Sequence, residues 1–179
     1  MAFIRPLMLL LLLSLPAAAL PRPVAAVDLQ RYSGQWFEIA RIPNTFQKAC
    51  AGDVRAEYRS LGKDGVLITN WCRKSSGEAF SLKARGELQD ASGSRWRVRP
   101  DSRWLSWVPM FKADYWIVDL ADDYSHAAVS MAGTDYLWIL SRQPVMSDEV
   151  YRQIIQRAAR QGFPVEKLRR TPVGVKTPS

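Results

Sequence analysis

The chain has 179 residues, with 25 Lys and Arg against 17 Asp and Glu, a formal net charge of +8 and one histidine. One histidine and two cysteines are too few for a zinc site or a Cys/His/Asp catalytic set of the usual kind. The basic residues are scattered, which argues against a nucleic-acid partner and fits either a solvated surface or contact with anionic lipid headgroups.

The first 19 residues have the pattern of an export signal. Arg5 precedes an apolar run at 7–15, and small residues at 17–19 precede a cleavage site, with a second acceptable site after Ala26. The run is too short to span a bilayer, and no cysteine lies near either site for lipid attachment. We therefore expect an exported chain without a lipid anchor, whose remaining 179 − 19 = 160 residues suffice for one domain.

The first predicted strand, 34–41, alternates with the period of two that a strand shows. Counting from Trp36, the alternation points Glu38 and Ala40 into the core and Arg41 away from it.

Two further predicted strands flank a hairpin turn at 62–65. Counting back from this turn places Tyr58 opposite Thr69 and Ala56 opposite Trp71, so we expect all four side chains to face the interior. A slip of one residue in this register would turn Thr69 and Trp71 outward.

Alternation and turn residues predict eight strands in all, spaced 8–12 residues apart and joined mostly by hairpin turns. This spacing is typical of an all-β, up-and-down antiparallel barrel or a sandwich. The loop before the sixth strand is unusually apolar and contains Trp104, Trp107, Met110 and Phe111. The predicted strands are 34–41, 54–59, 66–73, 80–85, 95–99, 115–120, 126–131 and 136–142.

One amphipathic helix follows the last strand. Ser147 is a plausible N-cap, two acidic residues follow it, and Gly162 ends the pattern. A single apolar stripe predicts that this helix packs on the outside of the barrel. We place the domain at 20–168 and a flexible tail at 169–179.

Three motifs together resemble the lipocalin family. Gly34-x-Trp36 opens the first strand, Asp123-Tyr124 lies in the turn between the sixth and seventh strands, and Arg142 ends the eighth. The residue before Asp123 is another Asp where the family usually has Thr. In an up-and-down barrel all three motifs reach the same rim, where an Arg over a Trp face would gain about 0.5–2 kcal/mol. We expect them to close the barrel and to have no other role.

The amino-acid sequences of the first and last strands are most similar to those of the bacterial outer-membrane lipocalins and their apolipoprotein D relatives. The resemblance covers about residues 28–165. It implies an eight-stranded lipocalin barrel that binds a fatty acid or a lysophospholipid and serves envelope lipid transport or maintenance. It implies no enzyme activity and no cofactor. We expect a soluble periplasmic or secreted protein, monomeric or homodimeric, with possible peripheral contact to an anionic membrane and no nucleic-acid partner.

The interior predicted from the strand patterns mixes small, aromatic and aliphatic side chains with a few hydroxyls, which suits a long apolar ligand with one polar end. The inward set also includes Ala40 and Ala128. The opposite rim, formed by the apolar loops, would be the ligand entrance or a membrane contact. The predicted ligand-binding residues are Glu38, Phe46, Ala56, Tyr58, Thr69, Trp71, Leu82, Ala84, Trp96, Val98, Trp107, Tyr115, Ile117, Ser130, Tyr136 and Trp138.

Glu38 is the anomaly in this interior, because an unpaired carboxylate there would be costly. It either forms hydrogen bonds with a buried Tyr or water, or it is protonated and donates to a ligand headgroup.

Cys50 and Cys72 are the only cysteines, and both belong near the entrance. Export favours their oxidation, so we predict a disulfide that pins the first entrance loop and contributes about 3 kcal/mol.

Three other functions stay open. An enzyme on this fold would use a free Cys50 as its nucleophile, although no base is obviously placed for it. A haem or tetrapyrrole carrier would need His126, the only imidazole. A structural envelope protein would have a filled barrel.

Overall fold

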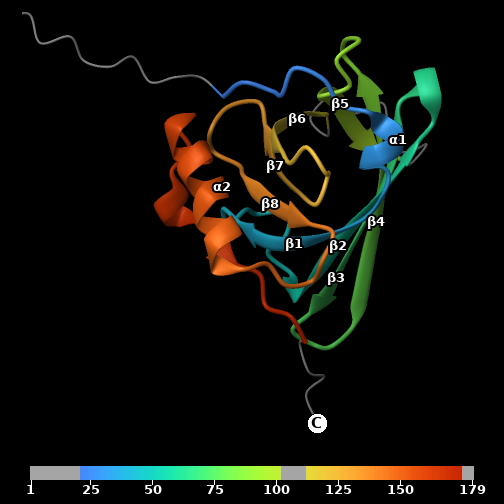
Figure 1. Cartoon of the computed structure of the whole chain (residues 1–179). Coiled ribbons are helices and arrows are strands. Elements are labelled where there is room, and N and C mark those ends of the chain that lie inside the picture. Colours follow the sequence, from blue (N-terminus) through green and yellow to red (C-terminus); the bar gives the residue numbers. More distant parts are fainter. Residues whose placement is uncertain (1–20, 102–111, 175–179) are drawn as a thin grey trace, which may run out of the picture.

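A computed structural model describes residues 21–101 and 112–174 of the chain. Eight antiparallel strands form a barrel, and one long helix lies against its outer wall (Figure 1). The predicted up-and-down barrel with one outer helix is confirmed. The elements are α1 (Leu29–Tyr32), β1 (Gly34–Arg41), β2 (Cys50–Ser60), η1 (Gly62–Asp64), β3 (Val66–Lys74), β4 (Ala79–Leu88), β5 (Arg95–Pro100), β6 (Ala113–Leu120), β7 (His126–Met131), β8 (Trp138–Ser141), α2 (Asp148–Arg160), η3 (Val165–Lys167) and β9 (Arg169–Arg170).

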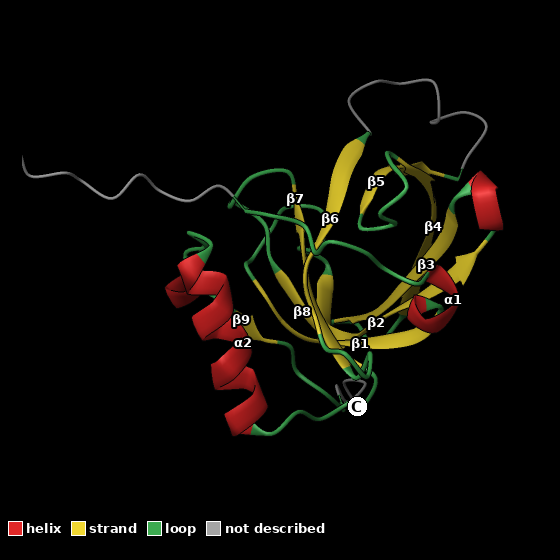
Figure 2. Cartoon of the chain, turned by 45° about the horizontal axis from the view of Figure 1, so that its top comes forward, coloured by secondary structure: helices red, strands yellow, loops and turns green. Residues whose placement is uncertain are grey.

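The barrel closes because β1 pairs on both of its sides. Its first half pairs with β2, where Trp36 lies opposite Ala56, and it also pairs with β8, where Glu38 lies opposite Leu140. Each of the other barrel strands pairs with its neighbour in sequence, so the sheet forms a ring with strands inclined around it (Figure 2).

The register of the β2–β3 hairpin differs by one residue from the prediction. Tyr58 lies opposite Ile68, and Thr69 and Trp71 lie opposite residues of the outward-facing row. The reason is the turn, in which η1 occupies 62–64 and the Leu61 amide donates to the Gly65 carbonyl. The loop therefore spans five residues rather than four, and Thr69 and Trp71 face outward while Ile68 and Asn70 face the interior.

A β-bulge between Glu38 and Ala40 reverses the alternation in the second half of β1. Ala40 lies opposite Ile139 and packs in the cluster under α2, and Arg41 lies opposite Trp138 on the interior side. Both orientations are the opposite of those predicted from strict alternation.

Two small residues of strand β7, Ala128 and Ser130, face away from the interior. Ser130 lies opposite Trp116, and Ala128 packs with Ile154 and Ala158 of α2. Small side chains at these positions allow the helix to approach the wall closely. The prediction that Ser130 and Ala128 face the interior is therefore wrong.

The outer helix begins and packs as the sequence predicts. Ser147 Oγ accepts a hydrogen bond from the Val150 amide at 3.3 Å, and Ile154 and Ala158 are buried. Arg157 of this helix forms an ion pair with Asp119 on β6, with Nη2 to Oδ2 at 2.7 Å.

Residues 169–174, which the sequence placed in a flexible tail, return to the barrel, while the rest of that predicted tail, 175–179, lies outside the described residues. Strand β9 pairs with the end of β1, the Thr171 amide donates to the Ile39 carbonyl at 2.9 Å, and the Asp53 amide donates to the Pro172 carbonyl at 2.9 Å. The segment occupies the gap where β1 and β2 diverge. Periodicity gives no signal for such a short strand.

Candidate functional site

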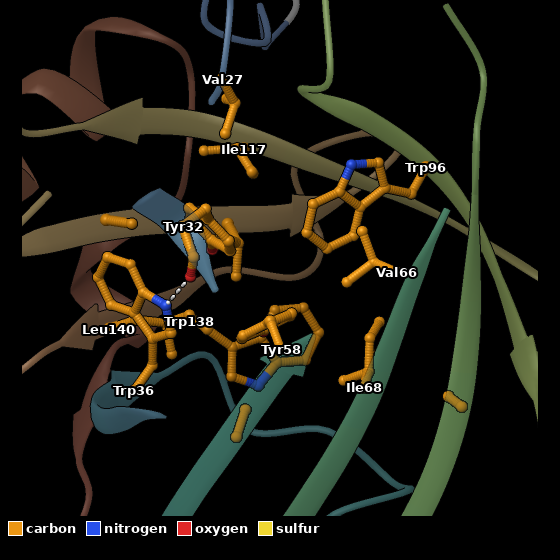
Figure 3. Packing of buried hydrophobic residues seen from close by; sticks show 14 residues of the cluster. Val27, Tyr32, Trp36, Tyr58, Val66, Ile68, Trp96, Ile117, Trp138 and Leu140 are labelled. Atoms are coloured by element: carbon orange, nitrogen blue, oxygen red, sulfur yellow. Dashed lines mark hydrogen bonds between the residues drawn. The ribbon is translucent and has the colours of Figure 1, made fainter. Parts of the chain in front are cut away.

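One end of the barrel is closed by aromatic side chains. Helix α1 places Tyr32 inside, where its ring centroid lies 4.9 Å from Trp36, 5.2 Å from Tyr58 and 5.8 Å from Trp96. The indole nitrogens of Trp36 and Trp96 each donate to a backbone carbonyl at 2.8 Å. Figure 3 shows these rings packed together with aliphatic side chains from several strands. This end is filled.

Arg142 fastens the closed rim. Its guanidinium lies 3.9 Å from the ring centroid of Trp36 and donates to the carbonyls of Gln35, Arg31 and Tyr32 at 2.7–3.0 Å. These contacts join the first strand to the last strand and to α1.

The turn before β7 joins the same rim. The Tyr124 hydroxyl accepts a hydrogen bond from the Asp28 amide at 2.9 Å, and Asp123 Oδ1 accepts one from the Ser125 amide at 2.9 Å. Gly34 has a φ of +99°, and a Cβ there would lie 3.3 Å from the Arg142 guanidinium, so glycine fits both the backbone and the close approach.

Three tyrosine hydroxyls meet inside the barrel next to this closed end. The Tyr115 hydroxyl shares hydrogen bonds with those of Tyr58 at 2.9 Å and Tyr32 at 3.3 Å. Burial raises the pKa of Tyr58 to about 12 and raises the pKa of Tyr32 and of Tyr115 well above the usual value of 10. All three phenols are therefore neutral across the physiological range.

The other end of the barrel exposes apolar side chains. Asn70 lies opposite Leu82 on the interior face, and Cys72 lies opposite Phe80 on the same face. Leu82 is 50% exposed and Phe80 is 42% exposed. In the loop after β1, Phe46 is 54% exposed and lies 5.6 Å from the ring centroid of Tyr136. We call this end, with the loops after β1, β3 and β7, the entrance.

Glu38 is buried below the entrance as a fully bonded carboxylate. Arg41 Nη1 and Thr171 Oγ1 both donate to Oε1, the latter at 2.5 Å, and Gln47 Nε2 donates to Oε2 at 2.8 Å. Trp138 Nε1 in turn donates to Gln47 Oε1 at 2.7 Å. Both carboxylate oxygens act as acceptors, and their partners are an arginine, an amide and a hydroxyl rather than the buried Tyr expected from the sequence.

The Cys50–Cys72 disulfide is confirmed, with Cα atoms 5.5 Å apart. It ties the start of β2 to β3 at the entrance. The Cys50 carbonyl also accepts a hydrogen bond from Arg41 Nη2 at 3.2 Å. With its sulfur in the disulfide, Cys50 has no free thiol for the nucleophilic role that the enzyme alternative needs.

The strand register and the packing of the barrel core show that most of the side chains predicted to face the interior do face it. Thr69, Trp71 and Ser130 do not, and Trp107 lies outside the described residues, as does the rest of the predicted apolar loop at 104–111. The inward residues are Glu38, Ala56, Tyr58, Leu82, Ala84, Trp96, Val98, Tyr115, Ile117, Tyr136 and Trp138.

Sequence reasoning missed several residues of this interior, among them Tyr32, Ile68, Asn70, Arg41, Val129 and Met131. For Ile68 and Asn70 the only available signal was the length of the turn, and for Arg41 it was the bulge that puts a basic residue beside Glu38.

His126 does not line the interior. It lies opposite Ser141 on the outward row of β7, and its Nδ1 shares a hydrogen bond with Ser125 Oγ at 3.0 Å. Within residues 21–101 and 112–174, His, Cys, Asp and Glu form no cluster of three that could hold a metal ion. In the same ranges no helix is long and apolar enough to cross a membrane.

Comparison with known proteins agrees with this architecture. The family model of the lipocalin-like domain matches residues 27–173. The chain is 35% identical to temperature-induced lipocalin-1 of Arabidopsis thaliana over 155 residues, covering 83% of this chain and 81% of that protein. It is 35% identical to the outer membrane lipoprotein Blc of Escherichia coli K12 over 154 residues, covering 83% and 82%.

More distant likenesses extend the same pattern. Apolipoprotein D of Mus musculus is 26% identical over 153 residues, covering 80% of this chain and 76% of that protein. The structure of insecticyanin from Manduca sexta superposes with a TM-score of 0.66 at 17% identity, covering 85% of this chain and 84% of that chain, and so supports the fold alone. The chain therefore belongs to the lipocalin family, whose members bind small hydrophobic ligands.

Proposed function

We propose that this protein binds a fatty acid or a lysophospholipid in the barrel and carries it within the cell envelope. The observation that carries the proposal is the contrast between the two ends. Aromatic side chains fill the closed end, whereas inward apolar side chains such as Leu82 and Phe80 are exposed at the entrance. Apolar side chains that face the interior but remain exposed to solvent are suited to contact an acyl chain.

The proposed acyl contacts are the inward side chains between the entrance and the tyrosines. Ala56 and Ala84 contribute small side chains to this interior, and Phe46 with the stacked pair Tyr136 and Trp138 forms an apolar wall at the entrance. Trp107, which lies outside the described residues, is included among the proposed ligand contacts on the sequence pattern alone.

Charge near the entrance favours an anionic or zwitterionic headgroup there. Lys48 is exposed in the loop after β1. Lys74 at the end of β3 forms an ion pair with Glu78, with Nζ to Oε2 at 2.9 Å, and its Nζ lies 5.5 Å from the ring centroid of Phe80. The net charge of +8 would also draw the protein to anionic lipid surfaces. Export to the periplasm or the exterior, as a monomer or homodimer, remains part of this proposal, and the name of the Blc relative supports an envelope location.

Lipid extraction followed by titration tests the proposal. We expect mass spectrometry of the purified protein to detect bound fatty acid or lysophospholipid, and the delipidated protein to bind hexadecanoic acid and lysophosphatidylcholine. Leu82→Gln should weaken binding about fivefold to tenfold, because it places a polar group against the acyl chain. Ser81→Gln, the outward neighbour on β4, is the matched control and should bind like the wild type. A protein that co-purifies with no lipid and binds neither ligand is a structural barrel and not a carrier.

A further inference from the structure

The three tyrosines inside the barrel form a polar group that closing the barrel does not require. Tyr32 comes from α1, Tyr58 from β2 and Tyr115 from β6, and their hydroxyls meet among apolar neighbours such as Trp96 and Ile117. Burying three hydroxyls in apolar surroundings is unfavourable unless they find partners. Phenylalanine at these positions would fill nearly the same volume without that cost.

Counting hydrogens shows that the group retains an unused donor. Three hydroxyls carry three hydrogens, and the two hydrogen bonds that join them, Tyr58 to Tyr115 and Tyr32 to Tyr115, use two. Within the described part of the chain, none of the three hydroxyls has another hydrogen-bond partner. One hydrogen and several lone pairs therefore remain for a group that enters the barrel.

The group lies at the boundary between the filled end and the more open interior. Tyr32 and Tyr58 are buried, whereas Tyr115 is only partly buried. Tyr115 lies between Met131 on β7 and Trp96 on β5. Met131 is also partly buried, and so is Val98, the next inward residue of β5 after Trp96. The partly exposed inward side chains of β5, β6 and β7 thus lead to the tyrosine hydroxyls. The end of a long ligand that fills the interior would stop there.

The chemistry at this point favours a neutral oxygen over an anion. The phenols are neutral and supply no positive charge to balance an anion. A carboxylate placed beside them would be desolvated without a charged partner. A hydroxyl or carbonyl oxygen can accept the free hydrogen bond without bringing a charge.

We propose that Tyr32, Tyr58 and Tyr115 form a second polar subsite that holds a neutral hydroxyl or carbonyl oxygen at the buried end of the ligand. The preferred ligand class is then an acyl chain with oxygen at both ends, the charged group at the entrance and the neutral group against the tyrosines. This inference rests on the proposed function and narrows its ligand class.

A matched pair of acids tests the subsite in the wild-type protein. Hexadecanoic acid and 16-hydroxyhexadecanoic acid differ only by a hydroxyl at the far end, and calorimetric titration of the delipidated protein gives the ratio of their dissociation constants. With the subsite present, the hydroxylated acid should bind at least as tightly as the plain acid. Without a partner, a buried hydroxyl should weaken binding at least about tenfold.

Variants locate the effect. Tyr115→Phe removes the one hydroxyl of the three that is partly exposed toward the interior, and should shift the ratio about tenfold against the hydroxylated acid, with little change for hexadecanoic acid. Tyr58→Phe leaves the Tyr32–Tyr115 hydrogen bond and one unused hydrogen in place, so it should shift the ratio less. Tyr151→Phe, on the outer helix α2, is the control and should leave the ratio unchanged.

The outcomes separate the two proposals. A wild-type protein that binds hexadecanoic acid but binds the hydroxylated acid tenfold more weakly overturns the subsite and leaves the carrier function standing. An unchanged ratio in folded Tyr115→Phe overturns it as well, and if that variant does not fold, the wild-type ratio alone decides. A protein that binds neither acid overturns the carrier function and the subsite with it.

Discussion

At the scale of single residues, the interior holds its polar groups in two separate ways. Glu38 is matched by Arg41, Gln47 and Thr171, so its charge is stabilised by direct hydrogen bonds. The tyrosines have no charged partner and stay neutral because burial disfavours the phenolate.

The raised pKa of Tyr58 predicts that the folded protein loses stability at alkaline pH. Its pKa is about 12 in the folded protein and about 10 when unfolded, so between pH 10 and 12 the unfolded chain releases a proton that the folded chain keeps. The free energy of unfolding should be unaffected by Tyr58 below pH 10 and should fall by about 1.4 kcal/mol per pH unit above it. Urea unfolding of the wild type and of Tyr58→Phe measures this, and parallel pH profiles from pH 9 to 12 would contradict it.

At the scale of elements, the hairpin between β2 and β3 depends on a glycine that sequence reasoning treated only as a turn former. Gly65 has a φ of +101°, and a Cβ there would lie 2.1 Å from the Gly86 carbonyl oxygen on β4. Gly62 in the same turn has a φ of +62°, and a Cβ added there would meet no other atom of the described chain within 4 Å. The two glycines thus separate backbone strain from steric overlap.

Gly65→Ala should destabilise the protein by about 3 kcal/mol or more, because it adds a backbone clash to the strain of a positive φ. Gly62→Ala is the control and should cost about 1 kcal/mol, since it carries the strain alone. Chemical denaturation of both variants checks the difference. Equal losses in the two variants would show that the approach of Gly65 to Gly86 is not a constraint on this turn.

At the scale of the whole molecule, the Cys50–Cys72 disulfide joins the entrance to a barrel that already closes through β1. It spans 22 residues, and the loop-entropy relation gives about 3 kcal/mol for a loop of that length. The double variant Cys50→Ala/Cys72→Ala should keep its far-ultraviolet spectrum and unfold at lower urea, by about that amount. Wild-type protein in reductant is the control and should match it; an unchanged midpoint in both would mean that the entrance is held by its hydrogen bonds alone.

The sequence predicts the barrel better than it predicts the wall of the site. Alternation and the motifs around Trp36 and Arg142 were sufficient for the strands and the closed rim, because burial on one face imposes a period of two. The orientation of Trp71 depended on one residue of turn length, and that of Arg41 on a bulge. Thr171 reaches Glu38 across the fold, and a contact between residues so far apart leaves no local pattern.

The position of the C-terminal segment has a practical consequence for handling the protein. The Gly174 amide donates to Asp53 Oδ1 at 2.6 Å near the start of β2, whereas the Val24 and Val27 amides donate to the carbonyls of Ile117 and Ser92 at the closed end. An affinity tag attached just beyond Gly174 would begin beside the entrance. A tag attached before Val24 would begin at the closed end, and is the better choice for binding assays.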